Sequence, residues 1–409
     1  MRLSDPPLQP IAYEAPQHVR DAVAALGRTE DIKLSPNNQR LAIADFEQNR
    51  IFVFAVSIVE SGQSKNISIS DVAEITSRGL SYPHGLDFIG DDKLLVANRA
   101  GEMSILAIPP AASGRLYVEP VSILHSDQIS TPGSVFVARN EAKSCEALIC
   151  NNYINSVTKH RLDLSDGGSL KSSEPLLRKW LDVPDGICLS GDGRWIAVSN
   201  HKTHTVLIFE NDGSLNKSSD PVGVLRQTKF PHGLRFTPDS RFLVVADAGA
   251  PVVNIYEKDV AGWSGVRDSA RSIKIISDSE YLRGRHSREH GGPKGIDINN
   301  VGTILVTTSE CQQLAFFDLA KILEPMLRST QRSVSAQVQN AKWMVIYQLL
   351  IGRIVAGAAA LMFSNVVFLH DLLKQIPGIG WALRKVRPLF NERFPTYAVR
   401  QQRNATPGV

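Results

Sequence analysis

The sequence contains little cysteine, and its four cysteines form no paired motif. Cys145, Cys150, Cys188 and Cys311 have no C-x-x-C spacing, so neither a zinc knuckle nor a small disulfide-stapled domain is indicated. Cys188 falls within a short apolar stretch, where a free cysteine usually serves as a small core residue. The first ten residues, MRLSDPPLQP, have no apolar run of the kind that marks a signal peptide. We therefore expect a reducing, cytoplasmic location.

The nucleophile-elbow motif of serine hydrolases is absent. No Gly-x-Ser-x-Gly segment occurs, which disfavours a serine hydrolase of that type.

The net charge is small, at +4 for the whole chain. Residues 343–409 hold eight Lys or Arg and two Asp or Glu, which leaves the preceding residues with a net charge of −2. A slightly acidic main domain argues against nucleic acid as its partner.

What the chain does contain is a repeated frame. Residues 183–210, VPDGICLSGDGRWIAVSNHKTHTVLIFE, read as a Pro-Asp-Gly turn followed by three short strands separated by polar turns. Similar frames occur five more times, with intervals of 47 to 62 residues between them. Six units of this length predict an all-β, six-bladed β-propeller, with seven blades as the alternative. The first strand residues of the frames are Ile32, Leu86, Val135, Ile187, Leu234 and Ile296.

The frames divide the chain into four parts. Residues 1–27 precede them, and within this segment residues 9–13 are expected to supply the outer strand of the last blade while residues 18–26 form a short helix. The propeller is predicted over residues 28–320, a linker over 321–342, and an α-helical C-terminal region over 343–409.

The C-terminal region combines apolar and basic sequence. Between residues 343 and 369 the only charge is Arg353, and this length suffices to cross a bilayer. Arg353, Ser364, Asp371 and Gln375 would share one stripe of a helix, however, which suits an interfacial or packed helix better than a single span. Residues 381–390 mix basic and aromatic side chains, as anionic membrane surfaces favour. We expect membrane association through residues 343–390; the alternative is a soluble helical pair.

The frame positions predict where chemistry would sit. In each frame the residue between Pro and Gly, or its equivalent, should point toward the mouth of the central channel. Four of these six residues are Glu, Asp or His, a set that suits a divalent cation such as Ca²⁺, Zn²⁺ or Mn²⁺; the alternative is a polar, water-filled mouth without an ion. The inner ring is Glu30, His84, Gly133, Asp185, His232 and Lys294, and the residues that close the second strands form a wider ring of Asp45, Asn98, Asn151, Asn200, Asp247 and Ser309.

Residues 283–292, RGRHSREHGG, form a basic, glycine-containing loop before the sixth frame. A solvated surface loop is one interpretation. The other is a clamp over the channel, in which Arg285 and His286 hold an anionic group of a substrate, because the arginine fork matches carboxylate and phosphate.

These frames resemble the gluconolactonase/regucalcin family of six-bladed propellers and, more loosely, seven-bladed lactonases. The resemblance covers roughly residues 28–320 and is carried by Glu30 and by Asp185 within its Val-Pro-Asp-Gly turn. Gly133 stands where the family has an asparagine ligand, so Asn151 or the two histidines would replace it. The resemblance implies a metal-dependent lactonase.

Two functions follow as hypotheses. The first is hydrolysis of a small lactone or ester by a metal ion bound to Glu30, Asp185, His84 and His232. Its catalytic candidates are Asp185, His232, Lys294 and Asp247, and its substrate-binding candidates are Asn98, Asn151, Asn200, Arg285 and His286. The second is a non-catalytic, membrane-associated propeller that serves as a binding or assembly platform. Neither hypothesis fixes the oligomeric state.

Overall fold

The computed structural model describes residues 6–62, 64–110, 112–141, 143–165 and 167–328. Residues 343–409 and most of the predicted linker lie outside these ranges, so the expected helical region and its membrane association stay predictions. Within the described ranges, no helix has the length and apolar character that a membrane crossing requires.

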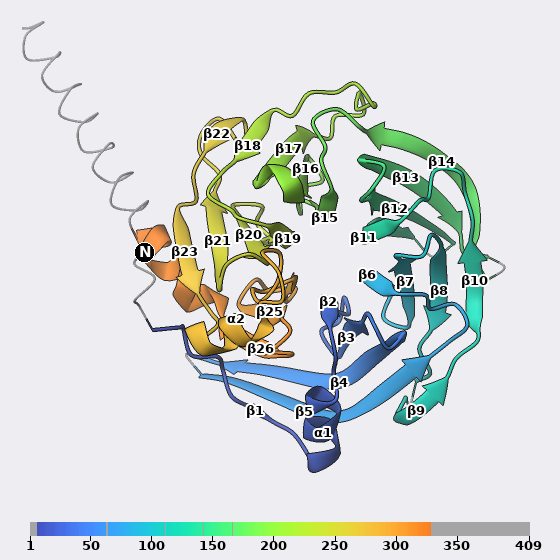
Figure 1. Cartoon of the computed structure of the whole chain (residues 1–409), viewed down its shortest axis with the longest axis vertical. Coiled ribbons are helices and arrows are strands. Elements are labelled where there is room, and N and C mark those ends of the chain that lie inside the picture. The colour runs from blue at the N-terminus through green and yellow to red at the C-terminus, as the bar shows by residue number, and fades with distance from the viewer. Residues whose placement is uncertain (1–5, 63, 111, 142, 166, 329–409) are drawn as a thin grey trace, which may run out of the picture. The chain divides into compact units, whose positions relative to one another are not determined.

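The described residues form six antiparallel sheets arranged around a central axis, which confirms the six-bladed β-propeller (Figure 1). The innermost strands β2, β6, β11, β15 and β19 surround the centre of the view. The first three blades contain β2 (Thr29–Leu34), β3 (Arg40–Asp45), β4 (Arg50–Ser61) and β5 (Ser64–Thr76); β6 (Pro83–Ile89), β7 (Lys93–Asn98), β8 (Met103–Ala107) and β10 (Pro120–Leu124); and β11 (Pro132–Glu141), β12 (Ser144–Asn151), β13 (Ser156–Asp163) and β14 (Ser169–Leu177).

The other three blades vary at their outer edges. The fourth gains a parallel strand, β22, from the insertion after β21, and the sixth has three strands within the described residues. These blades contain β15 (Pro184–Leu189), β16 (Trp195–Asn200), β17 (Thr205–Glu210), β18 (Gly223–Leu225) and β22 (Gly265–Arg267); β19 (Pro231–Phe236), β20 (Phe242–Asp247), β21 (Val252–Glu257) and β23 (Arg271–Lys274); and β24 (Gly295–Ile298), β25 (Ile304–Thr308) and β26 (Ala315–Asp318).

The N-terminal segment spans the junction between the last and first blades. Ile11 forms a single antiparallel bridge with Phe316 of β26, and the two-residue strand β1 (Tyr13–Glu14) then pairs in parallel with β5 of the first blade. The outer strand expected from residues 9–13 is therefore reduced to one bridge on the sixth blade. Helix α1 (Gln17–Ala24) follows, and β9 (Gly114–Tyr117) also joins the first blade beside β5.

The core lies between the blades. The second strands carry near-continuous apolar runs, and β16 and β20 are buried along their whole length because neighbouring blades cover both faces of each sheet. One apolar cluster joins Ile32 and Phe52 of the first blade to Ile304 and Phe316 of the sixth. The ring thus closes mainly by side-chain packing between its two end blades.

A bulge at the start of the inner strands positions the frame residue. In the first five blades the pairing of inner and second strands shifts register immediately after the first pair, for example between Pro184 and Gly186. A bulge leaves one residue unpaired and re-aims its side chain. The unpaired position holds Glu30, His84, Gly133, Asp185 and His232, and this is the structural reason why the residue between Pro and Gly faces the channel.

The third blade contains a buried histidine that makes stability depend on pH. His160 in β13 is 1% exposed, with its ring nitrogens 2.9 Å from Ser173 Oγ and 2.7 Å from Thr158 Oγ1. Burial lowers the pKa of His160 to about 4. The unfolded chain, with a histidine pKa near 6.5, binds more protons than the folded chain between these values. His160 therefore contributes stability above pH ~6.5 that is lost as the pH falls toward ~4.

We expect this loss to reach about 3 kcal/mol at pH ~4. Urea unfolding of the wild type and of His160→Gln at pH 7 and pH 4.5 measures it. The wild type should lose roughly 2–3 kcal/mol more than the variant between the two pH values. Equal losses in both proteins would show that His160 does not carry the effect.

Candidate metal and catalytic site

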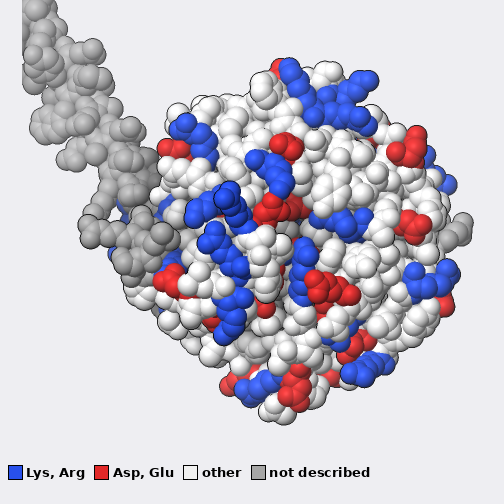
Figure 2. All heavy atoms as spheres, in the orientation of Figure 1, with Lys and Arg blue, Asp and Glu red and all other residues white. Residues whose placement is uncertain are grey.

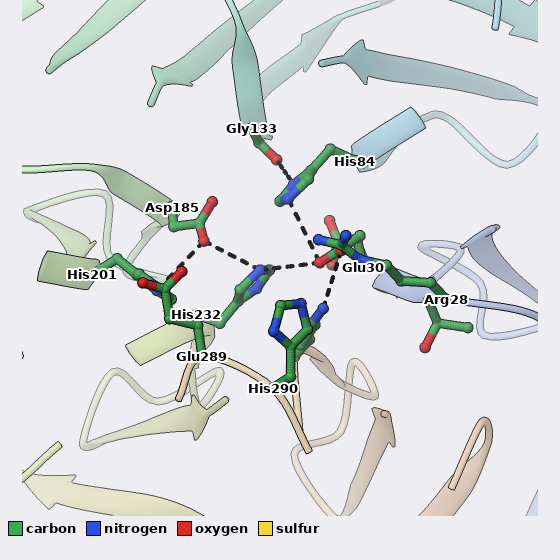
Figure 3. A network of polar contacts seen from close by, with 12 residues as sticks. Arg28, Glu30, His84, Gly133, Asp185, His201, His232, Glu289 and His290 are labelled. Carbon is green, nitrogen blue, oxygen red and sulfur yellow. Dashed lines mark hydrogen bonds and ion pairs between the residues drawn. The ribbon is translucent and has the colours of Figure 1, made fainter. Parts of the chain in front are cut away.

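Three side chains from different blades meet at the channel mouth (Figure 3). Oε2 of Glu30 lies 3.6 Å from Nε2 of His84 and 3.4 Å from Nε2 of His232. All three residues are buried, and their ligating atoms lie within 4.8 Å of one another. Oε2 of Glu30 has no hydrogen-bond partner among the described residues. A proton, a water molecule or a cation between them would satisfy a buried carboxylate oxygen that faces two imidazoles without a hydrogen bond.

The backbone fixes the orientation of His84. Its Nδ1 donates to the carbonyl oxygen of Gly133 over 2.6 Å, so its Nε2 carries the lone pair when the ring is neutral. Burial, aided by the positive charge of Arg99, lowers the pKa of His84 to about 3. The ring is therefore neutral at pH 7 and presents a ligand nitrogen toward Glu30.

Glu30 is held as a carboxylate by cations on its other oxygen. Oε1 pairs with Arg28 and lies 3.1 Å from Nζ of Lys294, which also lies 3.1 Å from Glu310. Burial would raise the pKa of Glu30, but the positive charges of Lys294 and Arg28 hold it well below its usual value. Oε1 thus has partners while Oε2 is left for a ligand.

Asp185 lies beside this group and connects it to a second histidine. Its Oδ2 is 3.2 Å from Nε2 of His232 and 3.6 Å from Nδ1 of His201, whereas Oδ1 accepts a hydrogen bond from Asn152 and lies 3.6 Å from Arg99. Burial opposes ionisation, yet these cationic and imidazole neighbours keep the pKa of Asp185 below its usual value. In turn, Asp185 and Glu30 overcome burial and raise the pKa of His232.

The space within the site is small. A cavity of about 10 Å³ is lined by Glu30, His84, Asp185 and His232, together with backbone and side chains of the inner strands. This is room for about one water molecule or one ion. The cavity itself therefore suits an ion, and an organic substrate would have to approach from the mouth above it.

The donor set fits a divalent cation. A tetrahedral ion with bonds of about 2.1 Å places its ligand atoms roughly 3.4 Å apart. The two separations from Glu30 Oε2, 3.4 and 3.6 Å, are close to this value. Two imidazoles and one carboxylate leave a fourth position open, as catalytic rather than structural zinc sites do. Asp185, predicted as a ligand, instead contacts His232 and has both oxygens engaged.

The wider ring anchors loops. Asn98, Asn151 and Asn200 each accept a hydrogen bond from the backbone N–H two residues before the frame proline and donate to a nearby carbonyl. Asp247 accepts three backbone N–H bonds, from Lys229, Phe230 and Gly249. With their polar atoms so occupied, these four residues shape the mouth, and the structure does not bring them to the Glu30 group as substrate ligands or base.

The channel-facing residues that the sequence reasoning missed stand one position further along the chain. They directly follow the wider ring, where strand alternation turns the next side chain inward. Arg99, Asn152 and His201 contact Asp185 from these positions, and Glu310 contacts Lys294. Choosing the residue after each position of the wider ring, rather than that position itself, would have identified them.

The basic loop does approach the site, but through other residues than expected. After α2 (Asp278–Gly284), Glu289 places Oε2 3.6 Å from Nε2 of His201 and pairs with Lys202, and His290 lies 3.7 Å from Glu310. Arg285 stacks over Tyr281 and is exposed together with His286. The loop therefore places the carboxylate of Glu289 and the imidazole of His290 at the channel mouth.

The surface charge of the propeller is mixed. Figure 2 shows basic and acidic side chains interspersed over the face in view. The predicted absence of a nucleic-acid partner stays a prediction.

Comparison with known proteins gives only distant matches. No family model and no curated protein matches the chain. A functionally unknown protein from Desulfotomaculum acetoxidans matches with a TM-score of 0.47 and 12% identity, over 71% of this chain and 83% of its own. Hydrazine synthase of Kuenenia stuttgartiensis matches with 0.45 and 14%, over 71% and 84%. A Bacteroides fragilis protein provisionally named 6-phosphogluconolactonase matches with 0.42 and 20%, over 60% and 69%. These matches carry no argument about activity.

Proposed function

We propose that the propeller binds a divalent cation through Glu30, His84 and His232 and hydrolyses a small lactone or related ester at the channel mouth. The observation that carries this proposal is the buried Oε2 of Glu30, which has no hydrogen-bond partner among the described residues and faces two imidazole nitrogens. When bound, such a cation would polarise a carbonyl oxygen and lower the pKa of a coordinated water.

The chain's own residues supply the remaining chemistry. Asp185 is held ionised next to His232 and is the candidate to accept a proton from water at the mouth. Lys294, predicted as a catalytic residue, instead lies between Glu30 and Glu310, so we assign it the role of holding the Glu30 carboxylate in place. His201, between Asp185 and Glu289, orients Asp185 and connects it toward the surface.

The test is hydrolysis of a lactone panel by full-length protein loaded with Zn²⁺, Mn²⁺ or Ca²⁺ and followed with a pH indicator. δ-Gluconolactone, γ-butyrolactone and dihydrocoumarin span polar, small and aromatic substrates. We expect turnover with at least one metal, its loss with a chelator, and a loss of roughly 10²–10⁴-fold in Asp185→Asn, as removal of a general base implies.

Asp212→Asn is the matched control, because Asp212 is exposed and bonds only to Ser214. It should behave as wild type. Full activity in Asp185→Asn would remove Asp185 from the mechanism. Absence of turnover with every metal and lactone would contradict the hydrolase and favour a binding role.

A further inference from the structure

The opposite end of the channel opens into a second cavity, of about 320 Å³. Its walls include one residue from each blade, four positions beyond the frame residue, so it lies on the propeller axis at the far end of the inner strands. We call it the far-end pocket. The six wall residues are Leu34, Phe88, Val137, Leu189, Phe236 and Ile298.

The far-end pocket has the make-up of a small-molecule site. Phe88, Phe136 and Phe236 give it aromatic walls, and polar residues line much of the remainder, among them Asp87, Arg235 and Asp297. Its volume falls in the range of about 300–1,000 Å³ that ligand pockets occupy. Aromatic walls beside charged groups favour a ligand that has an apolar body and one polar end.

One carboxyl group of the pocket has no cationic partner. Asp87 and Asp297 line the pocket, and Asp297 lies 2.9 Å from Arg235 Nε; Asp31, which lines the cavity at the mouth, lies 3.2 Å from Lys33 Nζ. Asp87 accepts only backbone hydrogen bonds, from Phe88 and Val137, and has no cationic partner among the described residues. It is partly exposed and lines the pocket.

A carboxylate without a counter-ion is costly in such surroundings. Burial, with Asp297 nearby, raises the pKa of Asp87 well above its usual value. A cation supplied by a ligand would remove this cost. Arg235 is engaged with Asp297 through Nε and with the carbonyl of Leu234 through Nη1, and its Nη2 has no hydrogen-bond partner among the described residues. Asp87 is thus the carboxyl group of the pocket that lacks a cationic partner, and one ammonium group would supply it.

We propose that the far-end pocket binds a small primary amine whose ammonium group donates to Asp87 and whose apolar body lies against Phe88, Phe136 and Phe236. The Phe136 ring already lies 5.5 Å from Arg235 Cζ, so the ring faces that would attract the ligand's cation are those of Phe88 and Phe236. The proposal is independent of the metal site at the mouth.

Binding of three probes of equal size to the full-length protein tests the charge requirement. They are phenethylamine, 2-phenylethanol and phenylacetate, measured by ligand-observed NMR titration. We expect saturable binding of phenethylamine with a Kd on the order of 1 mM, as suits so small a ligand. The alcohol should bind at least roughly tenfold more weakly, and the acid should show no saturable binding.

Variants locate the site. Leu189→Trp should fill the pocket without touching Asp87 and abolish amine binding, and Asp87→Asn should reduce it at least tenfold, to the level of the alcohol. Val266→Trp, at a 63% exposed position of β22, is the matched control and should bind normally. Glu30→Gln should also bind normally, which separates this pocket from the metal site. Equal binding of amine and alcohol, no saturable amine binding, or unchanged binding in Leu189→Trp or in folded Asp87→Asn would overturn the proposal.

Discussion

Replacing Glu30 with glutamine is expected to abolish stoichiometric binding of a divalent cation. Glutamine keeps the shape of the side chain but removes the charge that faces His84 and His232. Loss of a residue that only hydrogen-bonds to a metal ligand weakens metal binding by about 10–100-fold, so loss of a direct ligand should weaken it by at least ~100-fold. Elemental analysis after dialysis against Zn²⁺ or Mn²⁺, followed by titration calorimetry, measures the effect.

The charge change also leaves Lys294 and Arg28 without their carboxylate partner, and unpairing buried charges costs about 3–5 kcal/mol. His84→Gln is therefore the second variant, because it removes one ligand nitrogen and leaves every ion pair of Glu30 to Lys294 and Arg28 intact. Glu102→Gln is the matched control: its side chain is 50% exposed and pairs with His125 at the surface. If the wild type binds no cation, or if folded Glu30→Gln and His84→Gln bind as wild type, the metal site is wrong.

The sequence predicted the inner ring because its residues share one physical cause. In five blades a bulge at the start of the inner strand aims the frame residue at the axis, and in three of them the bulge coincides with a Pro-x-Gly turn, at residues 83–85, 184–186 and 231–233. The repeat makes this position readable without any structure. Glu30 was included although its frame has neither proline nor glycine, and the structure places it in the same bulge.

The rest of the site could not be read from the frames alone. The side chain of a residue at the end of a strand can point toward the loop or toward the channel, and two consecutive residues point in opposite directions. Asn200 turns to the loop and bonds to Asp182, while His201 turns to Asp185. Ion pairs such as Lys294 with Glu30 join residues 264 positions apart, and their pairing depends on the packing of the first blade against the sixth.

The far-end pocket was missed for a related reason. Its charged residues lie within the inner strands, where the sequence shows only a polar residue among apolar ones, as in Gly-Leu-Asp-Phe at Asp87. In the sequence alone, such residues cannot be distinguished from ordinary polar positions of a strand. Whether each carboxylate finds a cation depends on neighbouring blades, because Asp297 meets Arg235 of the fifth blade.

A clear loss of stability is expected from Gly186→Ala. A Cβ at this position would lie 2.1 Å from the backbone oxygen of His232 and 2.9 Å from Ser199 Oγ. The carbonyl belongs to β19 of the next blade and cannot rotate away, so the two blades must separate. Overpacking of this kind costs about 1–3 kcal/mol and more where backbone blocks relaxation. In a domain of this size we expect Tm to fall by roughly 2–5 °C.

The same substitution should also weaken cation binding. Gly186 follows Asp185 and packs against the strand that carries His232, and the Asp185 and His232 side chains are 3.2 Å apart. Separating the two strands would therefore move His232 within the site. Gly213→Ala is the control: Gly213 has a φ of 86° and no atom within 4 Å of an added Cβ. Its cost is conformational only, about 1 kcal/mol, with no effect on the site. Thermal unfolding by circular dichroism and cation titration of both variants separate the two costs. If Gly186→Ala unfolds no earlier than Gly213→Ala and binds the cation as wild type, the close contact between the inner strands of the fourth and fifth blades does not require glycine at position 186.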